Sequence, residues 1–391
     1  MERRTILLTA MSLGLGGAET HVVSLARELK RRGHNVSVAS QGGCLVADLA
    51  ESGILHHTVP LHSRSPLMLM EAVRAISGIL KKESPDLIHA HARIPAWVCN
   101  LAAARHGAAG RRTPIVTTYH GVYAAGFPWN FFTYPGDRTI AVSEDVAEHL
   151  IKRFRFDRAK VEVVPNGIDT DRFSPDRGPS PAVTNFGISG RPVILHASRL
   201  SGPFADTSLA LVEACPAIAR EWPSAQVVIV GDGDRFEEVR TEVERMNRHL
   251  RSTLDSDREG REFIVLTGGQ EDMPPLYACA DVVVGVARVA LEAMATGKAV
   301  ILAGEGGLRG LLVEDNVDLA AEHNFTARGA GEEVTARGLL RELSRVLGDA
   351  SARSSLGAMG RRIVLERYSI RRMVDMIEEI YADVLRGEAA C

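Results

Sequence analysis

Three histidines stand at or just after the ends of β-branched, apolar runs. His89 and His91 close the run over residues 86–91, and His120 follows the run over residues 114–118. Such runs are typical of buried parallel strands, whose carboxyl ends meet at one edge of a sheet. We therefore expect the three imidazoles to gather at that edge and to mark a functional site. A structural role in the core is the alternative for each histidine taken alone.

Cationic side chains that could hold phosphate occur in the second half of the chain. Arg199 comes just after the apolar run 192–197, and Arg288 opens a helical pattern after the run 281–286. A guanidinium group at a strand end can bind phosphate oxygens through two parallel N–H groups. Glu292 lies four residues after Arg288, so the two side chains share a helix face. A plain surface ion pair is the alternative for these two residues.

A glycine-rich turn near the amino terminus could bring backbone amides close to a phosphate. The turn Gly14-Leu15-Gly16-Gly17-Ala18-Glu19 leads into a helix, whose amino terminus attracts anions. The dinucleotide fingerprint needs a third glycine where Glu19 stands, and the next apolar run ends at Gln41 without an acidic residue. NAD binding is therefore disfavoured. A tight turn without a ligand is the alternative.

A second glycine-rich turn, Gly231-Asp232-Gly233-Asp234, follows the run 225–230. Two aspartates in this spacing could hold a divalent metal on a diphosphate. The flanking glycines make a simple turn the better interpretation. The sequence shows no other convincing metal cluster, so we predict no metal site and expect activity to persist in EDTA.

Short apolar runs alternate with helical patterns throughout, which predicts an α/β protein with parallel sheets covered on both faces. The expected strands in the first half are residues 4–10, 35–39, 55–61, 86–91, 114–118, 138–142 and 160–164. After a join at about residues 165–191 the pattern restarts, with strands at 192–197, 225–230, 262–267, 281–286 and 298–303. Helices are expected at 18–32, 206–220, 234–251 and 288–296, and residues 335–386 have the pattern of consecutive helices. Ligands of open parallel sheets bind beyond the carboxyl ends of the strands, so the loops there are the expected site.

Composition narrows the class of protein. A chain of 391 residues exceeds one ordinary core, so two domains are expected. The net charge of −3 offers no basic surface for nucleic acid. The cysteines never form a CxxC pair, which disfavours a zinc site or a disulfide framework and fits a reducing compartment; they are Cys44, Cys99, Cys215, Cys279 and Cys391. The amino-terminal apolar run is interpreted as a buried strand rather than a signal peptide, and no run is long enough to cross a bilayer, so a cytoplasmic protein is expected.

Taken together, these motifs resemble the retaining glycosyltransferases of family 4. The resemblance runs nearly end to end, and it depends on the order and spacing of the segments rather than on any one of them. The segments are GLGGAETHVVSLARELKRRGHNV (14–36), HAHA (89–92), TYHG (118–121), TIAVSEDVAEHL (139–150), VEVVPNGIDTDRFSP (161–175), HASRL (196–200), VVIVGDGD (227–234) and VALEAMATGKAVI (289–301).

The resemblance implies a GT-B fold, in which two doubly wound Rossmann-like domains face a cleft and a helical tail follows. Residues 1–170 would form an acceptor-binding domain and residues 171–365 a domain that binds the sugar nucleotide. A helix within 366–391 would pack back on the first domain. The implied reaction is a metal-independent, hexosyltransferase-like transfer from a UDP- or GDP-linked sugar to a cell-envelope or secondary-metabolite acceptor, without a cofactor.

The resemblance also assigns roles to residues. Glu292 matches the glutamate that binds the ribose hydroxyls, Arg199 the arginine on the donor diphosphate, and His120 the histidine near the transferred sugar. The catalytic candidates are His120, Arg199 and Arg288. The donor-binding candidates are Gly16, Gly17, Arg199, Gly231, Gly233, Val286, Ala287, Arg288 and Glu292. The candidates on the acceptor side are Glu19, His89 and His91.

Two positions depart from the family pattern. Val284 stands where the first glutamate of the E-x7-E motif is expected, and Phe204 stands where a phosphate-binding lysine is usual. We expect Phe204 to contribute nothing to phosphate chemistry and Arg288 to replace the missing cation. Loss of the carboxylate at position 284 favours a donor sugar other than a common hexose. A catalytically impaired binding or partner protein on the same fold is the alternative, whereas the motifs do not support a sugar-nucleotide epimerase.

The segment 152–160, KRFRFDRAK, is basic and carries two aromatic residues. Such a segment could touch an anionic membrane that presents a lipid-linked acceptor. We therefore expect a cytoplasmic location with possible peripheral contact at the inner membrane face. A solvated loop is the alternative.

Overall fold

The computed structural model describes residues 2–107, 112–178, 186–253 and 261–389. The chain divides into two compact units. Unit 1 comprises Met1–Gly167 and Ile370–Cys391, and unit 2 is the continuous segment Ile168–Ser369. The predicted boundaries at residues 170 and 365 lie within a few residues of these divisions.

Unit 1 is built on a parallel sheet with the order β3-β2-β1-β4-β5-β6-β7. Every strand coincides with an expected one: β1 (Thr5–Thr9), β2 (Asn35–Ser40), β3 (Leu55–Thr58), β4 (Leu87–His91), β5 (Ile115–Tyr119), β6 (Arg138–Ala141) and β7 (Val161–Val163). All five residues of β4 and of β5 are buried, because helices cover both faces of the sheet. The prediction of a doubly covered parallel sheet is confirmed.

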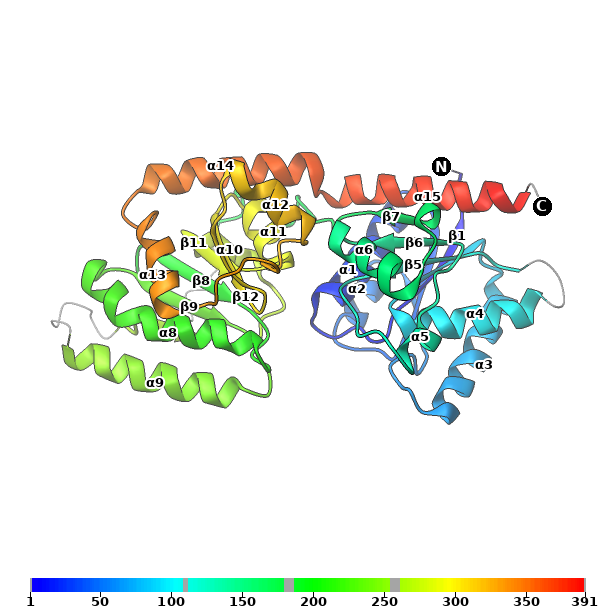
Figure 1. The fold of residues 1–391 in the computed structure, drawn as a ribbon, viewed down its shortest axis with the longest axis horizontal. Helices are drawn as coiled ribbons and strands as arrows, with labels where there is room; N and C mark the ends of the chain where they lie inside the picture. The colour runs from blue at the N-terminus through cyan, green and yellow to red at the C-terminus, as the bar shows by residue number, and fades with distance from the viewer. Residues whose placement is uncertain (1, 108–111, 179–185, 254–260, 390–391) are drawn as a thin grey trace. The chain divides into compact units, whose positions relative to one another are not determined.

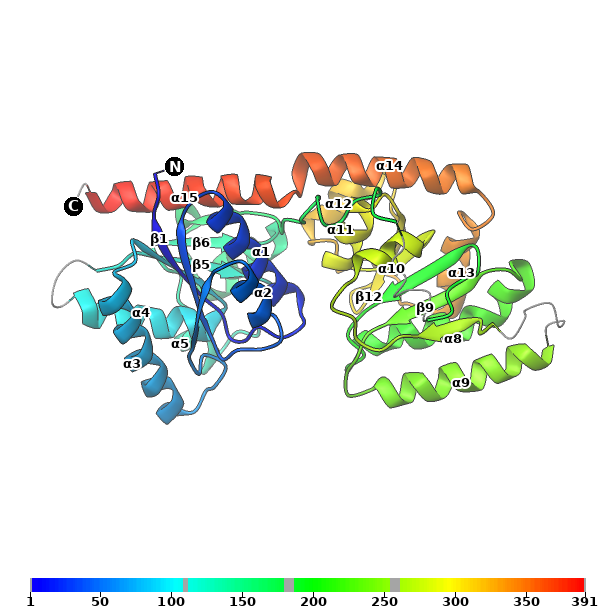
Figure 2. The ribbon, with the colours of Figure 1, turned by 180° about the vertical axis from the view of Figure 1, so that it is seen from behind.

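The helices of unit 1 form one layer on each face of the sheet (Figures 1 and 2). They are α1 (Gly17–Arg31), α2 (Val46–Glu51), α3 (Pro66–Glu83), α4 (Arg93–Gly107), α5 (Trp129–Phe132), α6 (Glu144–Phe154) and α15 (Ile370–Ala389). Helix α15, the last in the chain, shares one core with α1, and α3 and α4 share another. Arg32 at the end of α1 also binds the carboxylates of Asp375 and Glu378 on α15, at 2.7 and 2.6 Å. The final helix therefore belongs to unit 1.

Unit 2 is built on a sheet with the order β10-β9-β8-β11-β12-β13. Five strands coincide with expected ones: β8 (Val193–Ala197), β9 (Gln226–Val230), β10 (Ile264–Leu266), β11 (Val282–Gly285) and β12 (Ala299–Gly304). The sixth, β13 (Gly307–Leu311), was not predicted and pairs antiparallel with β12. Its glycines at positions 307 and 310 both have positive φ and dilute the apolar pattern, which explains why the strand was missed.

Helices cover the sheet of unit 2: α8 (Phe204–Glu221), α9 (Phe236–Thr253), α10 (Pro274–Cys279), α11 (Arg288–Ala295), α12 (Val317–Glu322), α13 (Ala336–Ser344) and α14 (Ala350–Arg367). Helices α13, α14 and α15 confirm the consecutive helices expected over residues 335–386. The two ends of unit 2 lie side by side, since the Ile168 amide donates to the Tyr368 carbonyl at 2.8 Å and Ile168 bridges Ser369.

The two sheets share one topological feature that positions a site. In unit 1 the strand order reverses between β1 and β4, and in unit 2 it reverses between β8 and β11. At such a switch point the loops after the two strands run in opposite directions and leave a crevice in which ligands bind. The residues after these four strands are therefore the ones to inspect.

The predicted membrane-contact segment differs from expectation. Phe156 is buried, and Phe154 lies under the Arg93 guanidinium at 5.0 Å, so neither aromatic ring is free for lipid. The lysines and arginines of residues 152–160 are exposed. No helix in the described part of the chain is long and apolar enough to span a bilayer.

Candidate active site

The switch point of unit 2 brings two predicted cations to one edge of the sheet. Arg199 follows β8 and Arg288 opens α11, directly after β11. The two strands are neighbours, with Val284 of β11 paired to His196 of β8. Val284 itself is fully buried in the apolar core. The carboxylate missing from the sequence motif is thus replaced by a core side chain, and the charged groups at this edge come from the loop and the helix.

Arg288 and Glu292 form a buried ion pair rather than the surface pair considered as the alternative. Arg288 Nε donates to Glu292 Oε1 at 2.7 Å, and the two side chains are only 14% and 9% exposed. The Tyr277 hydroxyl donates to the other carboxylate oxygen at 3.0 Å. Burial, followed by the negative charge of Glu292, raises the pKa of Tyr277 well above its usual value, so the tyrosine stays a donor.

One nitrogen atom of the Arg288 guanidinium has no hydrogen-bond partner among the described residues. This atom, Nη1, is buried. A buried cationic N–H group without an acceptor is costly, because it loses water without a replacement. An anion bound here would remove that cost. The arrangement therefore suits a phosphate oxygen beside Arg288.

The backbone that leads into α11 is strained. Ala287 has φ 51° and ψ −121°, a conformation that normally requires glycine, and its amide donates to the Phe325 carbonyl at 2.7 Å. Such a conformation costs about 1–3 kcal/mol and persists only when the surroundings impose it. Here it sets the direction in which α11 begins and so the position of Arg288. The preceding residue, Val286, packs against Gly304 of β12.

Phe204, which is expected to contribute nothing to phosphate chemistry, contacts the other cation directly. The Arg199 guanidinium carbon lies 4.6 Å from the centre of the Phe204 ring. The flat guanidinium is exposed, and stacking on an aromatic ring restricts its orientations. Phe204 therefore orients Arg199, although it adds no charge. The sequence motif signalled only that a lysine was missing.

Gly231 and Gly233 are explained by packing between loops. A Cβ atom on Gly231 would collide with the Ser198 carbonyl oxygen, and one on Gly233 would collide with the loop at residues 200–201. The close approach lets the Leu200 amide donate to the Asp232 carbonyl at 2.9 Å. The Asp232 carboxylate accepts a hydrogen bond from the Gly233 amide at 2.8 Å. These contacts fit the interpretation of Asp232 and Asp234 as turn residues.

In unit 1 the glycine turn follows β1. Gly16 caps α1 and Gly17 begins it. A Cβ atom on Gly16 would collide with the Glu19 carboxylate, which folds back over it, whereas nothing lies within 4 Å of that position on Gly17. The first glycine is therefore explained by Glu19, and the second leaves the amino terminus of the helix accessible.

The loops after β4 and β5 bring two of the three predicted histidines together. His91 Nδ1 and His120 Nε2 are hydrogen-bonded at 3.1 Å. Burial lowers the pKa of His120 to about 4 and that of His91 well below its usual value. Both rings are therefore neutral at physiological pH.

His89 does not take the role expected for it, and His21, for which no role was expected, takes its place beside His91 and His120. His89 is fully buried, with Nδ1 bonded to the Tyr381 hydroxyl of α15 at 2.6 Å and Nε2 bonded to Thr118 Oγ1 at 2.7 Å. It has no ring nitrogen left for an acceptor, which corrects its proposed role. His21 of α1, which we did not predict, lies with its ring centre 5.5 Å from that of His91 and 4.8 Å from that of His120. The only available signal was its place one turn into the helix after the glycines.

Comparison with known proteins identifies the family to which this chain belongs. The sequence model described as "Glycosyltransferase Family 4" matches residues 15–172, and the one described as "Glycosyl transferases group 1" matches residues 191–335. The chain is a glycosyltransferase of family 4. The structural neighbours support the two-domain GT-B fold predicted for it.

Similar proteins match nearly the whole of this glycosyltransferase or a large part of it. N-acetyl-alpha-D-glucosaminyl L-malate synthase of Bacillus anthracis is 24% identical and covers 96% of each chain. A GDP-mannose-dependent phosphatidylinositol monomannoside mannosyltransferase of Mycobacterium tuberculosis is 28% identical over 59% of this chain and 57% of its own. The crystal structure of Anabaena HepE with UDP and glucose has a TM-score of 0.71 at 19% identity, and it covers 97% of this chain and all of the other.

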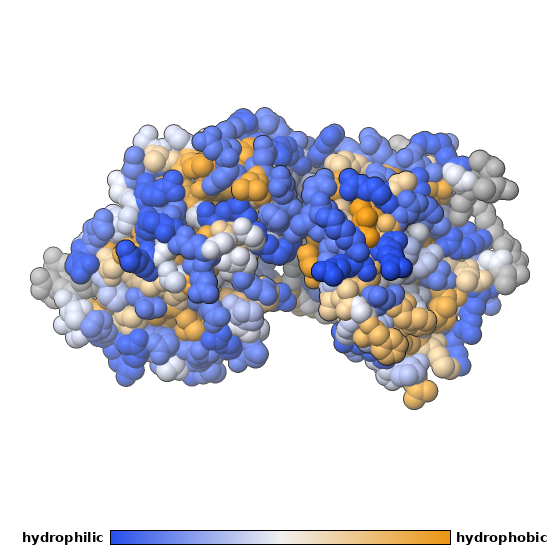
Figure 3. Space-filling view, in the orientation of Figure 1, coloured by the Kyte–Doolittle hydropathy of each residue, from blue (hydrophilic) through white to orange (hydrophobic). Residues whose placement is uncertain are grey.

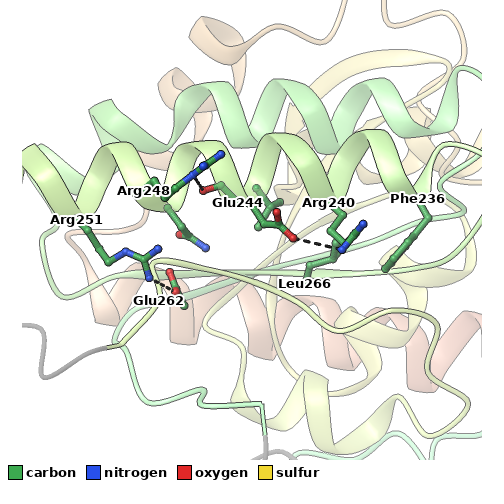
Figure 4. Close-up of a pocket in the computed structure, with 9 residues that line it drawn as sticks. Phe236, Arg240, Glu244, Arg248, Arg251, Glu262 and Leu266 are labelled. Carbon is green, nitrogen blue, oxygen red and sulfur yellow. Dashed lines mark hydrogen bonds and ion pairs between the residues drawn. The ribbon is translucent and has the colours of Figure 1, made fainter.

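A hollow of about 470 Å³ on unit 2 lies away from the switch-point loops of this glycosyltransferase. It runs along α9 and the edge strand β10, where Figure 4 shows the residues that line it. Its arginines are already bonded: Arg240 to Glu237 and Glu244, Arg251 to Glu262, and Arg248 to the Glu244 carbonyl. The hollow therefore offers no unpaired cation for a phosphate, and none of the predicted donor-binding residues line it.

Proposed function

We propose that the glycosyltransferase transfers a sugar, with retention of the anomeric configuration, from a UDP- or GDP-linked donor to a cell-envelope or secondary-metabolite acceptor. Unit 2 would bind the donor and unit 1 the acceptor. The observation that carries this proposal is the buried, unpartnered Nη1 of Arg288 beside Glu292 at the switch point of unit 2. The names of the relatives support nucleotide-sugar chemistry in general.

Each group at this switch point has a task in the proposed reaction. As the glycosidic bond breaks, negative charge grows on the leaving diphosphate, and Arg199 and Arg288 would stabilise it. Glu292 would accept hydrogen bonds from the ribose hydroxyls, since each carboxylate oxygen keeps a lone pair beside its present donor. Phe204 would hold Arg199 in position. Amides and guanidinium groups would thus replace the metal ion that other transferases use on the diphosphate.

In unit 1, His120 would lie near the transferred sugar. Its neutral ring can accept a hydrogen bond, and Gly17 and the start of α1 would approach the phosphates through backbone amides. Glu19 and His91 remain the candidates on the acceptor side. His89 is excluded by its two internal hydrogen bonds.

Membrane contact is proposed at a surface other than residues 152–160. Figure 3 shows apolar side chains gathered over α3 and α5. The exposed residues there are Leu67, Met70, Phe127 and Phe131, of which Phe127 is 97% exposed. Arg64 stacks on Trp129 at 4.4 Å in the same region. Aromatic and apolar side chains beside a cation suit the interface of an anionic membrane that presents a lipid acceptor.

The proposal is tested by donor binding and by turnover. A thermal-shift screen across nucleoside diphosphates and their sugars should raise the Tm with one base, because a ligand of the folded state stabilises it by mass action. Slow release of nucleoside diphosphate without an acceptor would then distinguish an enzyme from the alternative, a binding protein. The anomeric configuration of the first product by NMR tests retention. Turnover should be unchanged in excess EDTA; a loss that magnesium or manganese restores would contradict the proposed metal-independent chemistry.

A further inference from the structure

His21 and His91, which are buried, and His120, which is half-buried, form a cluster in unit 1 whose close spacing sugar transfer alone does not require. His21 comes from α1, His91 ends β4, and His120 follows β5. One ring nitrogen of each lies within 4.8 Å of the others. We propose that these histidines bind one late first-row divalent cation, with Zn²⁺ as the representative ion. This inference goes beyond the proposed function and does not depend on it.

The spacing is close to that of a metal site. A tetrahedral zinc ion with bonds of about 2.0–2.1 Å separates its nitrogen ligands by roughly 3.3 Å. His91 Nδ1 and His120 Nε2 are already 3.1 Å apart. The third nitrogen must approach by at most about 1.5 Å, which side-chain rotation on a helix can supply. The ligands come from three rigid elements of one unit, so the site needs no rearrangement between units.

The chemistry of the three side chains selects the cation. His91 Nδ1, which faces His120 Nε2, is the ligand atom of this ring, and the buried Nε2, which has no hydrogen-bond partner among the described residues, carries the ring proton, so the imidazole can bind in its neutral form. Neutral imidazole suits zinc, cobalt, nickel and copper, whereas magnesium and manganese prefer oxygen ligands. Three histidines with an open fourth position are a known type of zinc environment. Glu19, two residues from His21, or a water molecule could complete the set.

His89 lies beside the cluster but, unlike the three proposed ligands, has both ring nitrogens occupied by hydrogen bonds. Its ring stacks on that of His91 with centres 4.3 Å apart, and the two hydrogen bonds join it to Tyr381 and Thr118. It therefore orients His91 without serving as a ligand. A cation bound at the cluster would engage His120, the residue proposed to lie near the transferred sugar. Occupancy is therefore expected to inhibit transfer rather than support it.

Binding is tested directly on the full-length protein after EDTA treatment and dialysis. Titration with ZnCl₂ by calorimetry should give a stoichiometry near one, and CoCl₂ should give the visible d–d absorption of a tetrahedral site. MgCl₂ should give neither. The single variants His21→Ala, His91→Ala and His120→Ala should each weaken zinc binding by 10-fold or more. His62→Ala, which removes an exposed histidine of the same unit, should leave it unchanged.

Two results would overturn the proposal: absence of the cobalt band in the unmodified protein, or equal zinc affinity in the His21→Ala variant and the His62→Ala control. Circular dichroism checks that each variant is folded, and if His91→Ala is not, the more conservative substitution His21→Gln on α1 replaces it. Inhibition of turnover by zinc, reversed by EDTA, is a second readout. Failure to find any donor would leave the calorimetric and cobalt results intact, so the two proposals fail separately.

Discussion

The two units of this glycosyltransferase share a strand order but place opposite kinds of polar group along the carboxyl edge of the sheet, at and beside the switch point. In unit 1 the loops after β4 and β5 present neutral imidazoles, whereas in unit 2 the loops after β8 and β11 present guanidinium groups and a carboxylate. In each unit the turn that follows one of these strands contains an alanine with positive φ, namely Ala92 after β4 and Ala287 after β11. The sheet therefore determines where a site can form, and the side chains in the loops determine its charge.

Burial acts differently on the two sets of groups. A histidine without a carboxylate partner loses its charge when it leaves water, as the lowered pKa of His120 to about 4 indicates. The Arg288 guanidinium, in contrast, has a carboxylate partner, since Glu292 Oε1 lies 2.7 Å from its Nε. Unit 1 is thus suited to uncharged ligands that donate hydrogen bonds to its imidazoles, and unit 2 to anions.

The largest expected effect is on stability in acid. Burial lowers the pKa of His89 to about 3, that of His120 to about 4 and that of His91 well below its usual value, all in unit 1, whereas in unit 2 it lowers that of His196 to about 4. The unfolded chain therefore binds more protons than the folded one below about pH 6.5, so the free energy of unfolding falls as the pH falls. Between pH 7 and 5 each residue contributes a loss on the order of 2 kcal/mol.

Unit 1 should therefore lose more stability than unit 2 over this range. Pulse proteolysis in urea at pH 7 and pH 5, with fragments assigned by mass spectrometry, measures each unit separately. Equal shifts in the two units would contradict the assignment of the neutral cluster to unit 1. The range ends above the window in which paired carboxylates such as Glu342 become protonated, so the histidines dominate it.

The next effect is on catalysis in unit 2. Arg288→Ala should lower turnover by roughly 10²-fold or more, with a smaller effect on donor affinity, because charge on the diphosphate grows in the transition state. Arg240→Ala, which removes an exposed arginine of α9, is the matched control and should change neither. Steady-state kinetics with the donor found by thermal shift supply the measurement. If Arg288→Ala affects turnover and donor affinity equally, the charge acts in the ground state alone.

Glu292→Gln should weaken donor binding by about 10- to 100-fold, which corresponds to the loss of a charge-assisted hydrogen bond of about 1.5–3 kcal/mol. Glutamine keeps the contact with Tyr277 but leaves Arg288 without its partner. Glu342→Gln is the control, since Glu342 is as buried but binds the Leu311 amide in another part of unit 2. Calorimetry that shows unchanged affinity in a folded Glu292→Gln variant would place the nucleotide elsewhere.

The smallest effect concerns the aromatic ring under Arg199. Phe204→Leu should lower turnover by about 2- to 5-fold, because the lost stacking is worth about 0.5–1 kcal/mol at an exposed site. Phe204→Tyr keeps a ring and should leave turnover unchanged. A leucine variant as active as the unmodified enzyme would show that Arg199 needs no orienting partner.

Sequence patterns were sufficient for the parallel strands because most of them are buried, largely apolar runs, and even the partly exposed strands β3 (LHHT) and β7 (VEV) lie within predicted ranges. They failed for β13, whose two left-handed glycines interrupt the pattern. They also could not separate His89 from His91, since residues two apart in a strand point to the same face. Tyr381, 292 residues further along the chain, takes the hydrogen bond of His89, and no local signal reveals such a partner.

The pattern of charged residues in the sequence also predicted some features of the candidate site and missed others. The spacing of Arg288 and Glu292 correctly placed both on one helix face, but their burial depends on Tyr277 and the packing of unit 2 around them. The stacking of Phe204 on Arg199 depends on the first turn of α8 and could not be inferred from a missing lysine. The roles assigned to these residues in binding and catalysis stay predictions.

The placement of α15 has a consequence for synthesis of the protein. The ribosome makes β1 to β7 before the whole of unit 2, so α15, the helix that completes the core of unit 1, emerges only after unit 2. Until Tyr381 arrives, His89 lacks one of its two partners and the apolar face of α1 is uncovered. Unit 2, an uninterrupted insertion whose ends meet at Ile168 and Ser369, has all its segments available earlier. Unit 1, although its strands are made before unit 2, is thus expected to complete its folding after unit 2.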